Sequence, residues 1–235
     1  MMKLPTINTP KYTLILPSTG KTIEYRPFLV KEEKILMIAQ ESEDTDQLTR
    51  AMIDVVRSCT FEAIDISKLS SFDIEYIFLK LRAKSVGEEV SIGIKCDNCE
   101  NVNNIKINLD SIEVTKTHDL PKKVMLTETI GIIPKYISLN EIQTISKTTD
   151  KSKSLVQTIA ANIESIFDSN DVYPISETSF EELDSFISSL NRQQVSKLED
   201  LIKNQPKVEK NLKFKCTKCE THNDKTIAGV QSFFE

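Results

Sequence analysis

The stretch IKCDNCENVNNIKI, residues 94–107, contains a C-x-x-C turn between two segments of strand character. A second stretch of the same form, FKCTKCETHNDKTI, spans residues 214–227. Each turn presents two sulfurs on one side, so two such turns facing each other supply the four thiolates of a tetrahedral metal site. The sequence therefore predicts one composite four-cysteine ribbon, whose ligands are Cys96, Cys99, Cys216 and Cys219.

The metal predicted for this site is structural Zn²⁺. With sulfur in all four positions, no position remains for an activated water, so the site is not expected to be catalytic. The cost of closing the long loop between the two pairs rises only with the logarithm of its length. An iron–sulfur cluster also accepts four thiolates and stays open as an alternative. A thioredoxin-like redox pair is disfavoured, because these turns lie between strands.

Three further residues are candidates for this chemistry, and we expect each to have another role. Cys59 occupies an apolar position of a helical pattern and is predicted to lie in the core. His222 follows Cys219 by three residues, but four sulfurs already complete the site. His118 lies in a polar link and is expected to be solvated.

Composition limits the class of protein. The 235 residues carry a net charge of −5, with 39% hydrophobic and 28% charged residues, which is typical of a soluble globular protein. The chain as a whole lacks the basic character of a nucleic-acid-binding protein. No apolar run approaches the ~18–20 residues of a membrane span, and the first residues do not resemble a signal peptide. We therefore expect a reducing cytosol, where paired cysteines indicate a metal rather than disulfides.

Apolar periodicity predicts an α+β fold in two similar passes. The first pass has a hairpin, three helices and the first C-x-x-C hairpin, with helices over 30–40, 47–61 and 66–86. The second pass begins with strands over 122–136 and continues with helices over 137–146, 153–167, 175–191 and 192–204. It ends in the second C-x-x-C hairpin.

The two passes align at a constant offset of 107 residues, which places Pro27 opposite Pro134 and Cys59 opposite Ile166. This pattern predicts two pseudo-repeats, residues 1–115 and 116–235, joined by the zinc ribbon and packed as one unit. The alternative is a chance alignment, since any two amphipathic helices align somewhere.

No sequence motif indicates an enzyme. Phosphate-binding glycine loops, the nucleophile elbow and HExxH are absent, and the only histidines are His118 and His222. Nucleic-acid binding is the rival function, because many zinc ribbons bind nucleic acid and lysines cluster near the second cysteine pair: Lys207, Lys210, Lys213, Lys215 and Lys218. The acids near the first pair and the negative net charge weigh against it.

The stretch GKTIEYRPFLVKEEKILMIAQESED, residues 20–44, resembles the baseplate proteins of T-even-type bacteriophages, in the group assigned to baseplate hub assembly. The shared signature is Y-R-P-F-x-V-K-E-E-K, here Tyr25–Lys34, followed by a long helical stretch in a chain of similar length. The resemblance implies a phage protein that assembles the tail hub in the host cytoplasm, either leaving afterwards or remaining in the virion baseplate. It implies other tail and baseplate hub proteins as partners, and no catalytic residues.

The YRPF segment, residues 25–28, has two interpretations. It could expose an arginine and two aromatic rings for binding another protein. Alternatively, the two rings fasten the hairpin onto the helix that follows, and we favour this second interpretation. The sequence as a whole then predicts a non-enzymatic tail-baseplate assembly protein, with a zinc-ribbon nucleic-acid-binding factor as the alternative.

Overall fold

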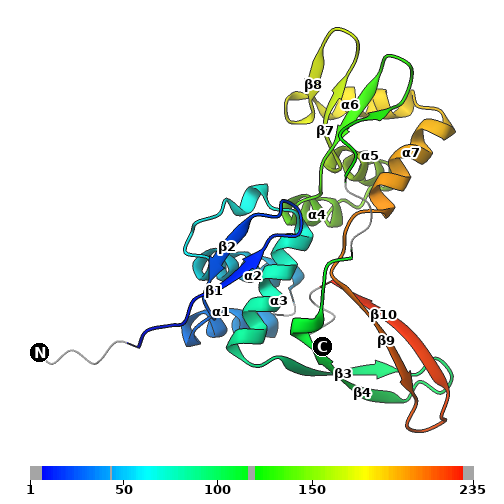
Figure 1. Cartoon of the computed structure of the whole chain (residues 1–235). Coiled ribbons are helices and arrows are strands. Elements are labelled where there is room, and N and C mark those ends of the chain that lie inside the picture. The colour runs from blue at the N-terminus through cyan, green and yellow to red at the C-terminus, as the bar shows by residue number, and fades with distance from the viewer. Residues whose placement is uncertain (1–6, 43, 116–119, 230–235) are drawn as a thin grey trace, which may run out of the picture. The chain divides into compact units, whose positions relative to one another are not determined.

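A computed structural model describes residues 7–42, 44–115 and 120–229 (Figure 1). The chain divides into two compact units: unit 1 comprises residues 1–115 and 207–235, and unit 2 comprises residues 116–206. Both units combine helices with antiparallel strands, which confirms the predicted mixed fold class. None of the helices in the described residues has the length and apolar character that crossing a bilayer requires.

Unit 1 is built from three α-helices and three antiparallel hairpins in its described part. The helices are α1 (Val30–Glu41), α2 (Thr45–Cys59) and α3 (Ser71–Ser85), with short 3₁₀ helices at Ile66–Lys68 and Leu109–Ser111. The hairpins pair β1 (Tyr12–Ile15) with β2 (Thr22–Tyr25), β3 (Glu89–Lys95) with β4 (Val102–Asn108), and β9 (Glu209–Lys215) with β10 (His222–Ala228).

Helix α3 is the centre of the unit 1 core. It begins at the N-cap Ser70, whose hydroxyl accepts a hydrogen bond from the Asp73 backbone N–H, and it buries apolar side chains on most of its surface: Phe72, Ile74, Ile77, Phe78, Leu79 and Leu81. The Asp73 carboxylate is itself fully buried and accepts hydrogen bonds from the backbone and hydroxyl of Ser18. This contact fixes the β1–β2 turn to the start of α3, since a buried carboxylate must keep its partners.

Unit 2 is inserted in the chain between β4 and β9, and its two connections to unit 1 start from paired backbone. Val114 and Val208 form an isolated antiparallel bridge, and both side chains are buried. The Thr115 N–H donates to the Lys207 carbonyl at 2.9 Å. The insertion therefore leaves unit 1 and returns to it at neighbouring residues.

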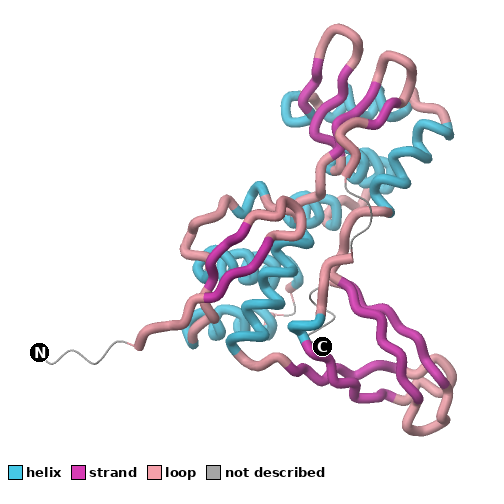
Figure 2. The backbone as a smooth tube through the Cα atoms, in the orientation of Figure 1, coloured by secondary structure: helices cyan, strands magenta, loops and turns pink. Residues whose placement is uncertain are grey.

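Unit 2 contains a four-stranded antiparallel sheet in the order β5-β6-β7-β8, seen in magenta in Figure 2. Its strands are β5 (Val124–Met125), β6 (Gly131–Pro134), β7 (Ile163–Phe167) and β8 (Val172–Pro174). Its helices are α4 (Leu139–Ser146), α5 (Lys151–Ala161), α6 (Phe180–Ser188) and α7 (Arg192–Lys203), with a 3₁₀ turn at Ile175–Glu177.

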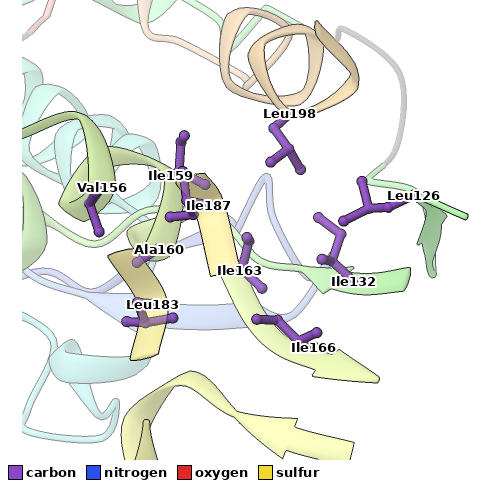
Figure 3. Close-up of a cluster of buried hydrophobic side chains, with 10 residues drawn as sticks. All are labelled: Leu126, Ile132, Val156, Ile159, Ala160, Ile163, Ile166, Leu183, Ile187 and Leu198. Atoms are coloured by element: carbon purple, nitrogen blue, oxygen red, sulfur yellow. The ribbon is translucent and has the colours of Figure 1, made fainter. Parts of the chain in front are cut away.

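A separate hydrophobic core holds unit 2 together (Figure 3). Side chains from β6, α5, β7, α6 and α7 meet the residue that follows β5 in one buried cluster, whose members are Leu126, Ile132, Val156, Ile159, Ala160, Ile163, Ile166, Leu183, Ile187 and Leu198. Each unit thus has its own core.

The helix predicted over residues 153–167 is wrong in its second half. Helix α5 ends at Ala161, and Ile163–Phe167 form β7. The Asn162 side chain donates to the Thr158 carbonyl at 2.7 Å, which completes the last helical turn and favours termination there. The apolar residues that follow fit a buried strand as well as a helix face, so their spacing was ambiguous.

The two passes nevertheless begin with the same local contacts. In unit 1 the Arg26 N–H donates to the Cys59 carbonyl at 3.0 Å, and the Arg26 guanidinium pairs with Glu32 at 2.9 Å. In unit 2 the Lys135 N–H donates to the Asn162 carbonyl at 3.0 Å, and its ammonium pairs with Glu141 at 2.6 Å. Each glutamate also accepts, at 2.9 Å, the backbone N–H three residues before it.

These contacts correct the predicted alignment in two places. They place Arg26 opposite Lys135, which is an offset of 109 residues (135 − 26). The predicted offset, which sets Pro27 opposite Pro134, is two residues shorter. The secondary structure differs as well, because Cys59 lies in helix α2 whereas Ile166, its predicted counterpart, lies in strand β7. The compact units themselves divide differently from residues 1–115 and 116–235, because the chain from Lys207 onward groups with the first segment. The two-repeat division stays a prediction.

The YRPF segment keeps its tyrosine and its arginine largely covered rather than exposed as a binding group. Tyr25 is 3% exposed, and its ring lies 5.6 Å from that of Tyr12. The Arg26 side chain is 12% exposed and is engaged by Glu32 and the Ser58 hydroxyl. Tyr25 and Arg26 are therefore not exposed for a partner, whereas the fastening of the hairpin onto the helix by the two rings stays a prediction, because the Tyr25 ring contact lies within the hairpin.

The buried Arg26–Glu32 pair should contribute more to stability than the more exposed Lys135–Glu141 pair, and this difference can be tested. Burial alone would raise the pKa of Glu32, but hydrogen bonds from Arg26, the Leu29 backbone and Ser58 lower the pKa to about 2. We expect Glu32→Gln to destabilise the protein by about 3 kcal/mol at pH 7, because it leaves the arginine buried and uncompensated. Glu141→Gln removes the half-exposed pair and should cost below about 1 kcal/mol.

The same pair predicts a pH dependence. A carboxylate whose folded pKa lies below its ordinary 4.5 stabilises the native state above pH 4.5, and this contribution is lost as the pH falls towards 2. Urea unfolding along this range should show the difference between the parent and Glu32→Gln shrinking with acid. A difference that stays constant would contradict the assignment.

Candidate metal centre

The two C-x-x-C turns have the same backbone structure. In the first, the Cys96 N–H donates to the Asn101 carbonyl at 2.9 Å and the Glu100 N–H donates to the Cys96 carbonyl at 3.0 Å. In the second, Cys216 with Thr221 and Glu220 with Cys216 form the same bonds at the same lengths. Glu100 and Glu220 both have positive φ, at 57° and 59°, a conformation that L-residues rarely adopt. Both hairpins therefore end in the same tight knuckle.

The two knuckles bring the four predicted sulfurs together (Figure 1 shows the β3–β4 and β9–β10 hairpins converging at these turns). Cys96 Sγ lies 3.6 Å from Cys219 Sγ, and Cys99 Sγ lies 3.7 Å from Cys216 Sγ. All four sulfurs lie within 4.8 Å of one another. A Zn–S bond of ~2.3 Å implies a tetrahedral S–S edge of ~3.8 Å, so the spacing fits a single four-thiolate ion.

The surroundings of the sulfurs favour thiolates on one side of the cluster and oppose them on the other. The Cys219 Sγ lies 3.3 Å from the Thr221 Oγ1, and hydrogen bonding with this threonine lowers the pKa of Cys219 to about 5. A backbone hydrogen bond from Asn101 is the largest influence on Cys99 and lowers its pKa, but burial and the neighbouring sulfurs of Cys219, Cys216 and Cys96 together outweigh it and raise that pKa to about 12. Four thiols this close cannot all ionise unless a cation compensates their charge.

Backbone and side-chain N–H groups point at the two buried sulfurs. Within each knuckle, the N–H two residues after the first cysteine reaches its sulfur, at 3.5 Å from Asn98 to Cys96 and at 3.4 Å from Lys218 to Cys216. Two buried asparagine amides reach the same sulfurs from the opposite hairpins, Asn223 to Cys96 at 3.5 Å and Asn103 to Cys216 at 3.7 Å. Such donors orient metal ligands and stabilise the ionised form.

The hairpins also carry complementary charge. Residues 88–110 contain five acids and two lysines, whereas residues 207–228 contain six lysines and three acids. Lys225 of the second hairpin forms an ion pair with Asp97 of the first. Opposite net charges favour the contact between the two hairpins.

The other candidate residues lie outside the cluster. Cys59 is fully buried in α2, as predicted, and burial raises its pKa to about 11. His222 is exposed at the start of β10. His118 lies outside the described residues.

Sequence reasoning missed Asn103 and Asn223, although a signal was present. Both stretches contain C-x-x-C-E-x-x-N, so each asparagine follows the second cysteine of its hairpin by four residues. The pattern identifies a shared turn and a shared buried position, but the asparagine's partners lie in the other hairpin and are invisible to local spacing.

Comparison with known families identifies the chain over almost its whole length. A family model described as "T4 bacteriophage base plate protein" matches residues 9–235. No curated protein and no solved structure matches the chain.

Proposed function

This chain belongs to the family of T4 bacteriophage base plate proteins, and on that premise we propose that it is a non-enzymatic assembly or structural protein of the baseplate hub. It acts through contacts with other tail and baseplate proteins, and one structural zinc ion stabilises it. It works in the host cytoplasm while the tail is assembled. It then either leaves or stays in the virion baseplate. The match of the family model over residues 9–235 carries this proposal.

The proposed ligands of the zinc ion are Cys96, Cys99, Cys216 and Cys219. Their mutual spacing supports a single ion, because an iron–sulfur cluster distributes its cysteines over several iron atoms and separates their sulfurs further. Zinc also supplies stability where the fold is weak, since two-stranded hairpins alone are marginal in water. With four sulfur ligands the ion has no open position, which supports a structural rather than a catalytic role.

Helix α1 supports the proposal of protein contacts. It buries Glu32 and Ala39, while its large apolar residues Val30, Met37 and Ile38 are 65%, 55% and 67% exposed. These three positions share one face of the helix by their spacing of seven and eight residues. Exposed apolar side chains gathered on one surface are typical of a protein-binding site.

Nucleic-acid binding is the alternative function, and two of the five lysines that suggested it form ion pairs within their own hairpin. Lys213 pairs with Asp224 at 3.8 Å and Lys215 with Glu220 at 2.8 Å, both within the second hairpin. Ion pairs of this kind leave fewer positive charges for phosphates.

We further propose that residues 1–115 and 116–235 derive from one ancestral repeat. The matching contacts of Arg26 and Lys135, and the identical knuckles, support it. The different secondary structure after α2 and α5 indicates that the halves have diverged between these anchors.

The zinc proposal predicts that Cys96→Ser or Cys216→Ser abolishes stoichiometric zinc binding and lowers the stability severely. Structural zinc contributes on the order of 10 kcal/mol in small peptides, so losing even part of that removes a large share of the ~5–15 kcal/mol that stabilises a typical domain. Elemental analysis and thermal melting of purified protein measure both effects. Cys59→Ala is the matched control and should retain one zinc. Serine variants that melt like the parent would rule out the metal.

The contact proposal predicts a separable defect for the double variant Met37→Lys/Ile38→Lys. Because both side chains are exposed, its melting temperature should stay close to that of the parent. Its association with purified tail-hub proteins, followed by size-exclusion chromatography, should be lost. Unchanged association would mean that α1 is not the binding face.

Retention on DNA separates the two functions. The zinc-loaded protein should elute from a DNA column at low salt, without the steep salt dependence that phosphate contacts cause. Tight retention that falls steeply with salt would favour the alternative.

A further inference from the structure

We infer that Asn103 and Asn223 form a reciprocal latch that joins the two cysteine hairpins before any metal binds and that sets the metal affinity once it does. The effect on metal affinity rests on the proposed zinc site, whereas the joining of the two hairpins does not. The latch would hold together two hairpins that an inserted unit separates in the chain.

Each asparagine first braces its own knuckle. The Asn103 side-chain N–H donates to the Asn101 carbonyl at 2.9 Å, and that of Asn223 donates to the Thr221 carbonyl at 2.9 Å. Both side chains are almost completely buried, at 2% and 4% exposure. A buried amide must satisfy its donors and its acceptor, so its geometry is strongly constrained.

Each asparagine then reaches into the other hairpin. The Asn103 Oδ1 accepts the Thr217 backbone N–H at 2.8 Å, and the Asn223 Oδ1 accepts the Asp97 backbone N–H at 2.9 Å. These N–H groups belong to the residues directly after Cys216 and Cys96. The amide N–H groups of the same two asparagines point at those two sulfurs, at 3.7 and 3.5 Å.

The two halves of each amide therefore have different roles. The oxygen holds a backbone N–H of the opposite knuckle and needs no metal to do so. The nitrogen donates to a sulfur and favours its thiolate form, which is the form that binds metal. Two such amides, at corresponding positions of the two hairpins, hold the knuckles together and position the sulfurs of Cys96 and Cys216 before the ion binds.

Amide hydrogen exchange of the metal-free, full-length protein tests the latch directly. In the parent, the Asp97 and Thr217 amides should be protected. Asn103→Ala should make the Thr217 amide exchange about tenfold faster, and Asn223→Ala should do the same to the Asp97 amide. The effect crosses from one hairpin to the other, which a general loss of stability would not produce. Protected amides in α3 report that unit 1 remains folded.

A conservative variant separates the two roles. Asn103→Asp keeps the acceptor oxygen but loses the donor and adds negative charge beside the sulfurs. We expect Thr217 to stay protected while zinc affinity, measured by competition with a chromogenic chelator, falls by about 10–100-fold. Asn104→Ala changes the exposed neighbour in the same strand and should leave both quantities unchanged.

Two results would overturn the latch: unprotected Asp97 and Thr217 amides in the metal-free parent, or alanine variants that exchange like the parent. If the parent binds no zinc yet shows the crossed protection, the zinc proposal fails and the latch stands. If Asn103→Asp binds zinc as tightly as the parent, the role of the amide nitrogen is wrong.

Discussion

Four sulfurs held within 4.8 Å of one another are the constraint that joins the two cysteine hairpins of unit 1. The paired sulfurs of Cys99 and Cys216 lie 117 residues apart in the chain, and those of Cys96 and Cys219 lie 123 residues apart, so their meeting closes a long loop. Neither two-stranded hairpin buries enough surface to be stable alone. Complementary charge and reciprocal asparagine contacts favour their association, and the proposed zinc ion would offset the repulsion that four adjacent thiolates create.

Unit 2 has its own core and begins and ends at the paired backbone of Thr115 and Lys207. The chain from Lys207 leads directly into β9, and the cysteine knuckle lies at the end of that strand. A zinc ion bound as proposed would keep this small hairpin module rigid.

The sequence predicted what is chemically local. Ligand type and C-x-x-C spacing identify Cys96, Cys99, Cys216 and Cys219 without any knowledge of the fold, and apolar periodicity locates most helices. It failed where distant partners decide. The strand character of Ile163–Phe167 depends on pairing with β6, and its apolar pattern alone suits a helix equally well. Asn103 and Asn223 join the two hairpins through hydrogen bonds to backbone N–H groups of the opposite hairpin, and local sequence spacing does not reveal these partners.

X-ray absorption spectroscopy at the zinc edge, on full-length protein purified without added metal, tests the central claim most directly. A single metal held by both knuckles predicts one zinc per chain with four sulfur ligands at about 2.3 Å and no nitrogen or oxygen ligand. A mixed ligand shell, or protein that carries no metal and has four freely titratable thiols at this site, would contradict it.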